Sequence, residues 1–280
     1  MTTKRYITTI LALSLLLPVG AQKMTLGTAK TKDGGDYNGE LQAGKPHGKG
    51  RTVYKNGNVY EGEYDKGKRQ GYGTYVFTDG EKYEGEWFQD QQHGQGIYFF
   101  SNNNRYEGLW FRDYQHGHGI MYYFNGDKYE GNWQEDKRHG EGTYTYSTGD
   151  NYSGDWRDDL KHGQGTFVWK NGDTYVGQWK ADKQDGRGKL TKKSGDTVEG
   201  QFKAGQPHGE CVARFADGAK FKGVFKNGKR NGPCIEEDKD GNRFEGTYKD
   251  DIRDGNFVEK DRNGKVKASG TYTRGHRITK

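Results

Sequence analysis

The sequence is poor in the residues that usually build a protein core. Only 29% of its 280 residues are hydrophobic, and leucine, isoleucine, valine and phenylalanine are scarce. On composition alone, this scarcity is typical of a disordered chain. Tyrosine and tryptophan return at regular intervals, however, and aromatic side chains can bury the surface that aliphatic side chains do not supply. We therefore expect a folded chain with an aromatic core.

The chain also lacks a strong excess of one charge. Its formal net charge is +6, which is too small to indicate a nucleic-acid partner. Residues 22–150 carry 16 basic and 19 acidic side chains, whereas residues 151–280 carry 27 and 20. A weak attraction of the C-terminal half to anionic surfaces is one interpretation, and interspersed charge on a solvated face is the commoner one.

Glycine and tyrosine, by contrast, are abundant and regularly spaced, with 46 and 20 copies. The stretch Tyr-Glu-Gly-Glu-Trp from Tyr83 to Trp87 is followed by His-Gly-Gln-Gly from His93 to Gly96, and the pattern recurs every 23 residues. Ten copies begin at Tyr37, Tyr60, Tyr83, Tyr106, Tyr129, Tyr152, Tyr175, Val198, Phe221 and Phe244. A fixed period in this range indicates a stacked repeat architecture.

This pattern resembles the MORN repeat family over residues 36–272. The resemblance implies units of two short strands that line up into an elongated sheet. It also implies a non-catalytic module for binding or scaffolding, of a kind sometimes proposed to contact phospholipid.

The residues themselves predict an all-β fold, an elongated single-sheet ribbon with two short antiparallel strands per 23-residue repeat. Tyr83, Gly85 and Trp87 alternate along a strand and point to one face, and the aromatic residues of the second strand share that face. Glycines between them let large rings lie across the backbone. Asn-Gly and Asp-Gly pairs such as Asn56-Gly57 favour a type I′ turn between repeats. Ten units would span about 100 Å.

The ends differ from the array. Lys4 and Arg5 precede an apolar run, and Val19-Gly20-Ala21 offers a cleavage site, so residues 1–21 are predicted to be a signal peptide. The expected location is therefore outside the cytoplasm, periplasmic or extracellular. Residues 22–35 form a polar lead with a possible edge strand at 25–29, residues 36–272 the repeat array, and residues 273–280 a tail.

No catalytic constellation is found, and we predict neither an enzyme nor a bound cofactor or metal. Six histidines share one repeat slot, and equivalent atoms about 10 Å apart cannot converge on one ion. Their expected role is a repeated loop contact. They are His47, His93, His116, His139, His162 and His208.

The two cysteines, Cys211 and Cys234, lie 23 residues apart, each in place of the second glycine of its repeat. A disulfide needs Cα atoms within about 7 Å, and one repeat step is nearer 10 Å, so two free thiols that point inward are expected. Inner aromatic residues are also lost at 190–192, 236–238 and 259–261, which predicts a frayed C-terminal end.

The third and fourth repeats stand out on the opposite face of the sheet. Positions that are polar in most other repeats are apolar here, and strand parity places them together. They are Phe88, Ile97, Phe99, Leu109, Phe111, Ile120 and Tyr122. An exposed apolar patch usually marks a contact site. A local twist that exchanges the two buried faces is the competing interpretation.

Two binding functions follow from these residues. The first is a scaffold for a protein partner or for a second copy of the chain, and it is the one we predict. The alternative is binding of lipid head groups or glycans through exposed aromatic side chains. No nucleic-acid partner is expected.

Overall fold

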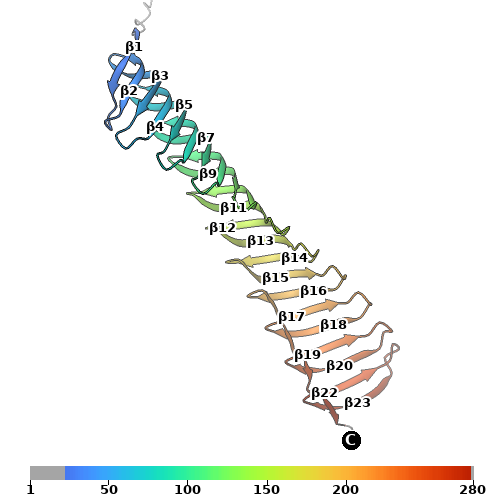
Figure 1. The fold of residues 1–280 in the computed structure, drawn as a ribbon. Coiled ribbons are helices and arrows are strands. Elements are labelled where there is room, and N and C mark those ends of the chain that lie inside the picture. The colour runs from blue at the N-terminus through green and yellow to red at the C-terminus, as the bar shows by residue number, and fades with distance from the viewer. Residues whose placement is uncertain (1–22, 279–280) are drawn as a thin grey trace, which may run out of the picture.

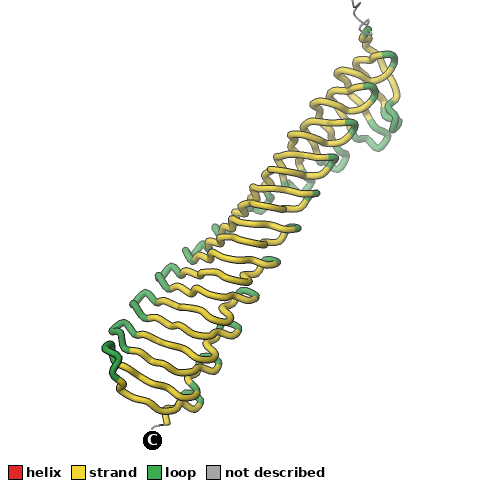
Figure 2. Tube along the Cα trace, turned by 180° about the vertical axis from the view of Figure 1, so that it is seen from behind, coloured by secondary structure: helices red, strands yellow, loops and turns green. Residues whose placement is uncertain are grey.

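The computed structural model describes residues 23–278 as one antiparallel sheet of 24 strands. Figures 1 and 2 show a long, twisted ribbon with its two ends far apart. No helix among these residues has the length and apolar character needed to span a membrane. The predicted fold class is confirmed, with two strands in each repeat.

The strands follow one another in sequence order, and from β2 to β20 their bounds repeat every 23 residues. They are β1 Met24–Lys30, β2 Asp36–Gln42, β3 Lys45–Val53, β4 Val59–Asp65, β5 Lys68–Val76, β6 Lys82–Phe88, β7 Gln91–Phe99, β8 Arg105–Phe111, β9 Tyr114–Tyr122, β10 Lys128–Gln134, β11 Lys137–Thr145, β12 Asn151–Arg157, β13 Leu160–Val168, β14 Thr174–Lys180, β15 Lys183–Thr191, β16 Thr197–Lys203, β17 Gln206–Arg214, β18 Lys220–Lys226, β19 Lys229–Glu237, β20 Arg243–Lys249, β21 Ile252–Arg253, β22 Gly255–Lys260, β23 Val266–Thr273 and β24 His276–Ile278.

Each strand pairs with its neighbours in the sequence, so the sheet is an uninterrupted meander. The lead residues contribute β1, which pairs with β2, and the tail contributes β24, which pairs with β23. Only the tenth repeat is irregular, because its second strand is divided into β21 and β22, which both pair with β20. The predicted signal peptide, residues 1–21, lies outside the described residues.

The two kinds of turn are distributed differently from the sequence prediction. Asn56 is not left-handed; only Gly57 is, with φ of 87°, and its N–H donates to Tyr54 O at 2.9 Å. The turn between repeats is therefore a three-residue loop, a type I turn closed by one left-handed residue. The two-residue turns with both residues left-handed lie inside each repeat, as at Gln89 and Asp90. The prediction of type I′ geometry at Asn-Gly was wrong because the same dipeptide suits both turns, and strand length decides between them.

The predicted inner face carries the core and is here called the aromatic face. Tyr60, Tyr83, Tyr106, Tyr129, Tyr152 and Tyr175 have no exposed surface. Each tyrosine meets the tryptophan or other aromatic ring of its own and the next repeat edge to face, as Tyr83 does with Trp87 and Trp110 at 5.2 and 5.3 Å. This geometry is favourable for aromatic pairs. The buried rings therefore form one continuous row along the ribbon, and partly buried rings such as Tyr75 and Tyr98 pack against it.

A bulge in each repeat explains why tyrosine is used rather than phenylalanine. Gly85 pairs with Gly96 but Glu86 pairs with His93, so two residues of β7 bulge out of the ladder. The bulge frees the Glu86 carbonyl, and the Tyr83 hydroxyl donates to it at 2.9 Å. The glycine opposite must be small, since a Cβ on Gly96 would lie 2.4 Å from the Tyr83 hydroxyl oxygen. The tyrosine and the glycine therefore form one packing unit.

In the two repeats that contain a cysteine, the cysteine replaces the glycine of this packing unit and the tyrosine is replaced as well. Both are free and buried, as predicted. Val198 replaces the tyrosine of the eighth repeat, and the Cys211 thiol lies 3.4 Å from the Gln201 carbonyl, the group that a tyrosine hydroxyl would otherwise contact. Cys234 faces Phe221 in the same way across Gly223. The thiols fill the volume that the tyrosine leaves.

The strand ladder continues to β24 through the repeats in which the aromatic pattern decays and for which a frayed end is predicted. The core divides into one cluster that ends at Phe202 and a second that runs from Ala213 to Phe257, and Val198 packs against both. Glu236, in a slot that holds an aromatic side chain elsewhere, pairs with Arg253 at 2.6 Å and Arg230 at 3.5 Å. At this end, ion pairs are thus added to ring contacts such as those of Phe244 with Phe257 and Tyr272.

Candidate binding surfaces

The seven apolar residues of the third and fourth repeats lie on the face opposite the core, here called the polar face. The set of Phe88, Ile97, Phe99, Leu109, Phe111, Ile120 and Tyr122 is called the polar-face patch. Its members divide into two groups. Phe88, Leu109 and Phe111 are 52%, 36% and 45% exposed, whereas the other four are half-buried.

The half-buried members alternate with charged residues across the sheet. Ile97 lies between Glu84 and Glu107, and Phe99 lies between Lys82 and Arg105. These charges pair within their own strands, as in Lys82–Glu84 at 2.7 Å and Arg105–Glu107 at 3.0 Å. The Lys82 ammonium also lies 4.4 Å from the Phe99 ring centroid. The middle of the patch is therefore a lattice of apolar and ionic side chains rather than a continuous apolar surface.

The exposed members continue into a row of alternating rings at the connector end of the strands. His93 lies 5.5 Å from Phe88 and 5.4 Å from Phe111, and Phe111 lies 5.7 Å from His116, measured between ring centroids. Among the described residues, the buried Nδ1 of His93 has no hydrogen-bond partner. In two other repeats this atom contacts the next connector: His47 Nδ1 accepts from the Lys66 amide at 3.4 Å, and His208 Nδ1 accepts from the Asn227 amide at 3.5 Å. Phe88 and Phe111 in this row are thus the members of the polar-face patch most open to a partner.

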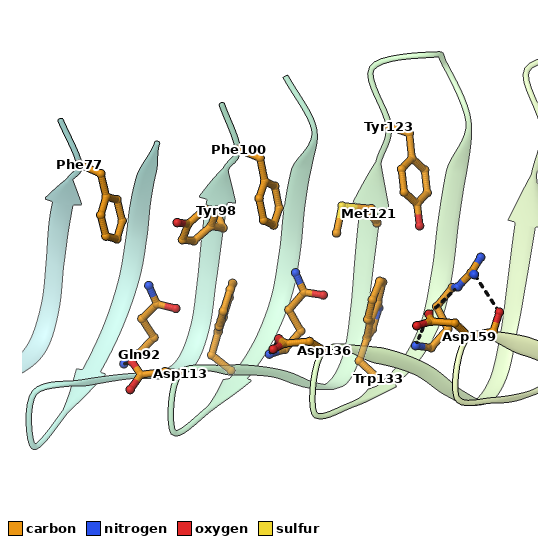
Figure 3. Close-up of a pocket in the computed structure, with 13 residues that line it drawn as sticks. Phe77, Gln92, Tyr98, Phe100, Asp113, Met121, Tyr123, Trp133, Asp136 and Asp159 are labelled. Carbon is orange, nitrogen blue, oxygen red and sulfur yellow. Dashed lines mark hydrogen bonds and ion pairs between the residues drawn. The ribbon is translucent and has the colours of Figure 1, made fainter. Parts of the chain in front are cut away.

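The aromatic face carries a second candidate site, which the sequence interpretation missed. A groove of about 850 Å³ opens over the third to fifth repeats. Its lining comprises Phe77, Gln92, Tyr98, Phe100, Trp110, Asp113, Gln115, Met121, Tyr123, Trp133, Asp136, Arg138 and Asp159. Figure 3 shows the rings of Phe77, Phe100 and Tyr123 along one side of the groove and the connector residues Asp113 and Asp136 along the other.

One aromatic side chain is replaced by methionine in the groove. Met121 takes the slot that Tyr98 and Tyr144 fill in the neighbouring repeats. Burial raises the pKa of Tyr98, and the Glu81 carboxylate, which accepts its hydroxyl proton in a hydrogen bond, raises it further. That hydroxyl stays protonated near neutral pH. The signals in the sequence were a methionine at a position that is aromatic in the neighbouring repeats, and the uncharged Gln92 and Gln115 at a position that is basic in five of the other eight repeats.

Among residues 23–278, no group of three or more histidine, cysteine and acidic side chains is arranged to hold a metal ion. The apolar, ionic and aromatic groups present are those of recognition by contact.

Comparison with known proteins identifies the repeat. The sequence profile described as MORN repeat matches the chain nine times in succession, over residues 37–197 and 199–243. The tenth copy, which begins at Phe244, lies beyond these matches. No curated protein has a significantly similar sequence.

Several solved structures contain a similar arrangement of strands. One is the TCP10 domain of Danio rerio CPAP in complex with a STIL peptide, with 13% identity, a TM-score of 0.40, and coverage of 89% of this chain and 100% of that one. Another is the TCP domain of Drosophila melanogaster SAS-4 with a proline-rich motif of Ana2, with 20% identity, a TM-score of 0.37, and coverage of 56% and 85%. Likenesses of this size do not identify a function.

Proposed function

The chain belongs to the MORN repeat family, and we propose that it is a non-enzymatic scaffold that binds a protein partner, or a second copy of itself, through the polar-face patch. The continuous ladder from β1 to β24 makes the ribbon a stiff support. A binding surface on such a support loses little conformational freedom when it is occupied.

The observation that carries the proposal is the exposure of Phe88 and Phe111. Both rings project from the polar face next to a histidine, in a position that other repeats fill with polar residues such as Gln134 and Arg157. Aromatic residues at the centre of an interface commonly contribute most of its binding energy.

The test combines Phe88→Gln and Phe111→Gln. Glutamine is the residue that the fifth repeat already has at this position. Partner capture or self-association should weaken by at least about 2 kcal/mol, as expected for truncated hot-spot residues. The melting temperature should change little, because exposed substitutions rarely alter stability by more than about 0.5 kcal/mol. The readouts are light scattering and pull-down from an extract of the source organism.

A matched control changes Arg157→Gln and Lys180→Gln, the same slot in the sixth and seventh repeats. Equal behaviour of the two double variants would remove the special role of the patch. Binding of the wild-type chain to lipid vesicles or a glycan array, lost in the Phe88 and Phe111 variant, would instead assign the surface to lipid head groups or glycans.

We further propose that residues 1–21 direct export and are removed after Ala21. Lys4 and Arg5, the short apolar run and the small residues before Gln22 support this proposal. Intact-mass measurement of the protein from the periplasm or the medium should give a chain that begins at Gln22. A membrane-bound product that retains residues 1–21 would contradict it.

A further inference from the structure

Half of the ten repeats hold a cation at the same place on the aromatic face, next to an aromatic ring. In the second repeat the Arg69 guanidinium carbon lies 4.2 Å from the Trp87 ring centroid, and its amide donates to Asp90 Oδ1 at 2.8 Å. The fifth repeat repeats this geometry, with Arg138 4.4 Å from Trp156 and bonded through amide and Nε to Asp159 Oδ1 at 3.0 Å. Each cation thus joins a tryptophan to the aspartate of the next connector.

The same slot and the same aspartate occur together in two further repeats, whereas Arg253 of the tenth repeat faces Gly275. Lys161 faces Asp182, and Arg230 faces Asp251. Where the slot holds no cation, the connector carries a glycine instead of the aspartate. Pro46, Gln184 and Pro207 face Gly67, Gly205 and Gly228.

Of the described repeats that keep the aspartate, the third and fourth alone lack the cation, and they are the repeats under the groove. Gln92 faces Asp113, and Gln115 faces Asp136. In both pairs the backbone N–H of the glutamine donates to Oδ1 of the aspartate at 2.8 Å. Neither carboxylate forms an ion pair with any of residues 23–278, and both side chains are exposed. The third and fourth repeats therefore keep the anion of the arrangement without its cation.

The aromatic part of the third-repeat site is also kept. Tyr98 and Trp110 lie 5.8 Å apart at 34°, and the pairs that hold a cation, Tyr75–Trp87 and Tyr144–Trp156, lie 6.0 Å apart at 37° and 6.2 Å apart at 36°. A pair of rings in this geometry attracts a cation by its electrostatic quadrupole. The volume that the arginine head occupies elsewhere opens here into the groove, because glutamine is shorter.

The glutamines themselves present unused polar groups. Gln92 and Gln115 are 7% and 5% exposed, and within residues 23–278 neither side-chain amide has a hydrogen-bond partner. Both line the groove, and in Figure 3 Gln92 points from the connector towards Phe77 and Tyr98. Because both side-chain amides line the groove, they are available to form hydrogen bonds with a ligand's polar atoms.

We propose that this groove binds an extended basic segment of a partner protein, whose two arginine or lysine side chains replace the cations that the third and fourth repeats lack. The partner's cations lie beside Trp110 and Trp133 and bind the carboxylates of Asp113 and Asp136. The proposal does not depend on the polar-face patch, which lies on the other side of the sheet.

The spacing of the two subsites favours a peptide. Equivalent points in adjacent repeats are two strands apart, or about 10 Å. In a polyproline II segment, side chains three residues apart point to the same side at about 9 Å. A chain running along the ribbon therefore presents a basic residue to each subsite, with two residues between them. The groove extends across both subsites, which suits a chain better than a single small cation.

The test uses a fluorescein-labelled peptide with the repeated sequence Ala-Pro-Arg and the full chain. Its affinity, from fluorescence anisotropy, should exceed that of an Ala-Pro-Glu peptide by at least about tenfold and should fall as salt is added. A peptide with its arginines one position closer should bind more weakly. Failure of the arginine peptide to bind at up to about 1 mM would overturn the proposal.

Two double variants locate the site. Gln92→Arg with Gln115→Arg supplies the missing cations from the chain itself, so it should melt no lower than the wild type and lose peptide binding. Asp113→Asn with Asp136→Asn removes the charge but keeps an oxygen that accepts from the backbone amides, and asparagine tolerates the positive φ of these positions. This variant should bind the peptide about tenfold more weakly. Wild-type affinity in both variants would overturn the proposal.

The controls separate this site from its alternatives. Asp159→Asn changes a carboxylate that Arg138 already neutralises, and it should leave peptide binding unchanged. Phe88→Gln with Phe111→Gln should also leave it unchanged, which distinguishes the groove from the polar-face patch. An alternative outcome is that the wild-type chain binds phosphatidylcholine vesicles and not the peptide. If the Gln92→Arg, Gln115→Arg variant then loses vesicle binding, the ligand of the groove is a lipid head group rather than a basic segment.

Discussion

At the scale of the residue, the fold depends on a tyrosine and a glycine that contact each other across neighbouring strands. Tyr129 donates to the Asn132 carbonyl at 3.0 Å, and a Cβ on Gly142 would lie 2.3 Å from its hydroxyl oxygen. The eighth and ninth repeats lose the tyrosine and gain a cysteine at the glycine position. The two positions are therefore coupled.

A double-mutant cycle tests this coupling in the fifth repeat. Gly142→Cys alone should destabilise the protein by about 1–3 kcal/mol, because the new side chain overlaps the Tyr129 ring. Tyr129→Val alone should destabilise it by more, since it leaves a cavity and a buried carbonyl without a donor. The combined variant reproduces Val198 and Cys211 and should be more stable than the sum predicts. Additive free energies of unfolding in urea would show that the two positions are independent.

The buried tyrosines also make the protein sensitive to high pH. Burial is the largest cause that raises the pKa of Tyr106 and Tyr152, and it raises that of Tyr175 to about 12. Because their pKa is higher in the folded state than in the unfolded state, the stability that these buried tyrosines contribute is fully present below about pH 10. It is lost as the pH rises further.

Several equivalent tyrosines act together, so we expect cooperative alkaline unfolding rather than independent titration. Tyrosinate absorbance and the far-UV circular dichroism signal should change in one transition above about pH 10. Smooth ionisation of all tyrosines with the sheet intact would contradict this expectation.

At the scale of the element, the connectors tie neighbouring repeats together through their aspartates. Asp182 has φ of 65°, and its carboxylate accepts the Lys161 amide at 2.9 Å. Glycine takes this position at Gly205 and Gly228, with φ of 88° and 80°. The position thus requires a left-handed backbone in every repeat and uses the carboxylate in some of them.

Substitutions at Asp182 separate these two requirements. Asp182→Gly removes only the hydrogen bond and should cost about 1 kcal/mol. Asp182→Ala also strains a left-handed backbone and should cost about 1–2 kcal/mol more. Thermal unfolding of both variants against the wild type provides the measurement. An alanine variant as stable as the glycine variant would show that the backbone conformation is not limiting.

At the scale of the whole molecule, the division of the core predicts unequal stability along the ribbon. All six tryptophans lie between Trp87 and Trp179, in the first cluster, and both cysteines lie near the start of the second or within it. In a repeat array, each unit is stabilised mainly by its neighbours, so a weak interface lets one part open before another.

These residues serve as natural probes of the two parts. As urea is raised, Cys211 and Cys234 should react with a thiol reagent at lower concentrations than those that change tryptophan fluorescence. The expected cause is the division of the core beyond Phe202, because the second cluster is smaller and contains no tryptophan. Coincident transitions would show that the array unfolds as one unit.

The sequence by itself determined the architecture, because the 23-residue period, the alternation around Tyr83, Gly85 and Trp87, and the parity of the second strand are local properties of a strand. The unpaired thiols followed from the same period. The polar-face patch was also named from parity, and its role in binding stays a prediction. Periodicity could not distinguish the two turn types, which differ in the number of residues that the flanking strands leave unpaired.

Only the tertiary structure decided what depends on residues in different repeats. The bulge that frees the Glu86 carbonyl, and hence the need for the Tyr83 hydroxyl, appears once the register of β6 and β7 is known. The groove depends on Gln92 meeting Asp113, 21 residues away, across stacked connectors. The sequence contains both residues, but a missing cation becomes visible only when the neighbouring repeats show where that cation lies.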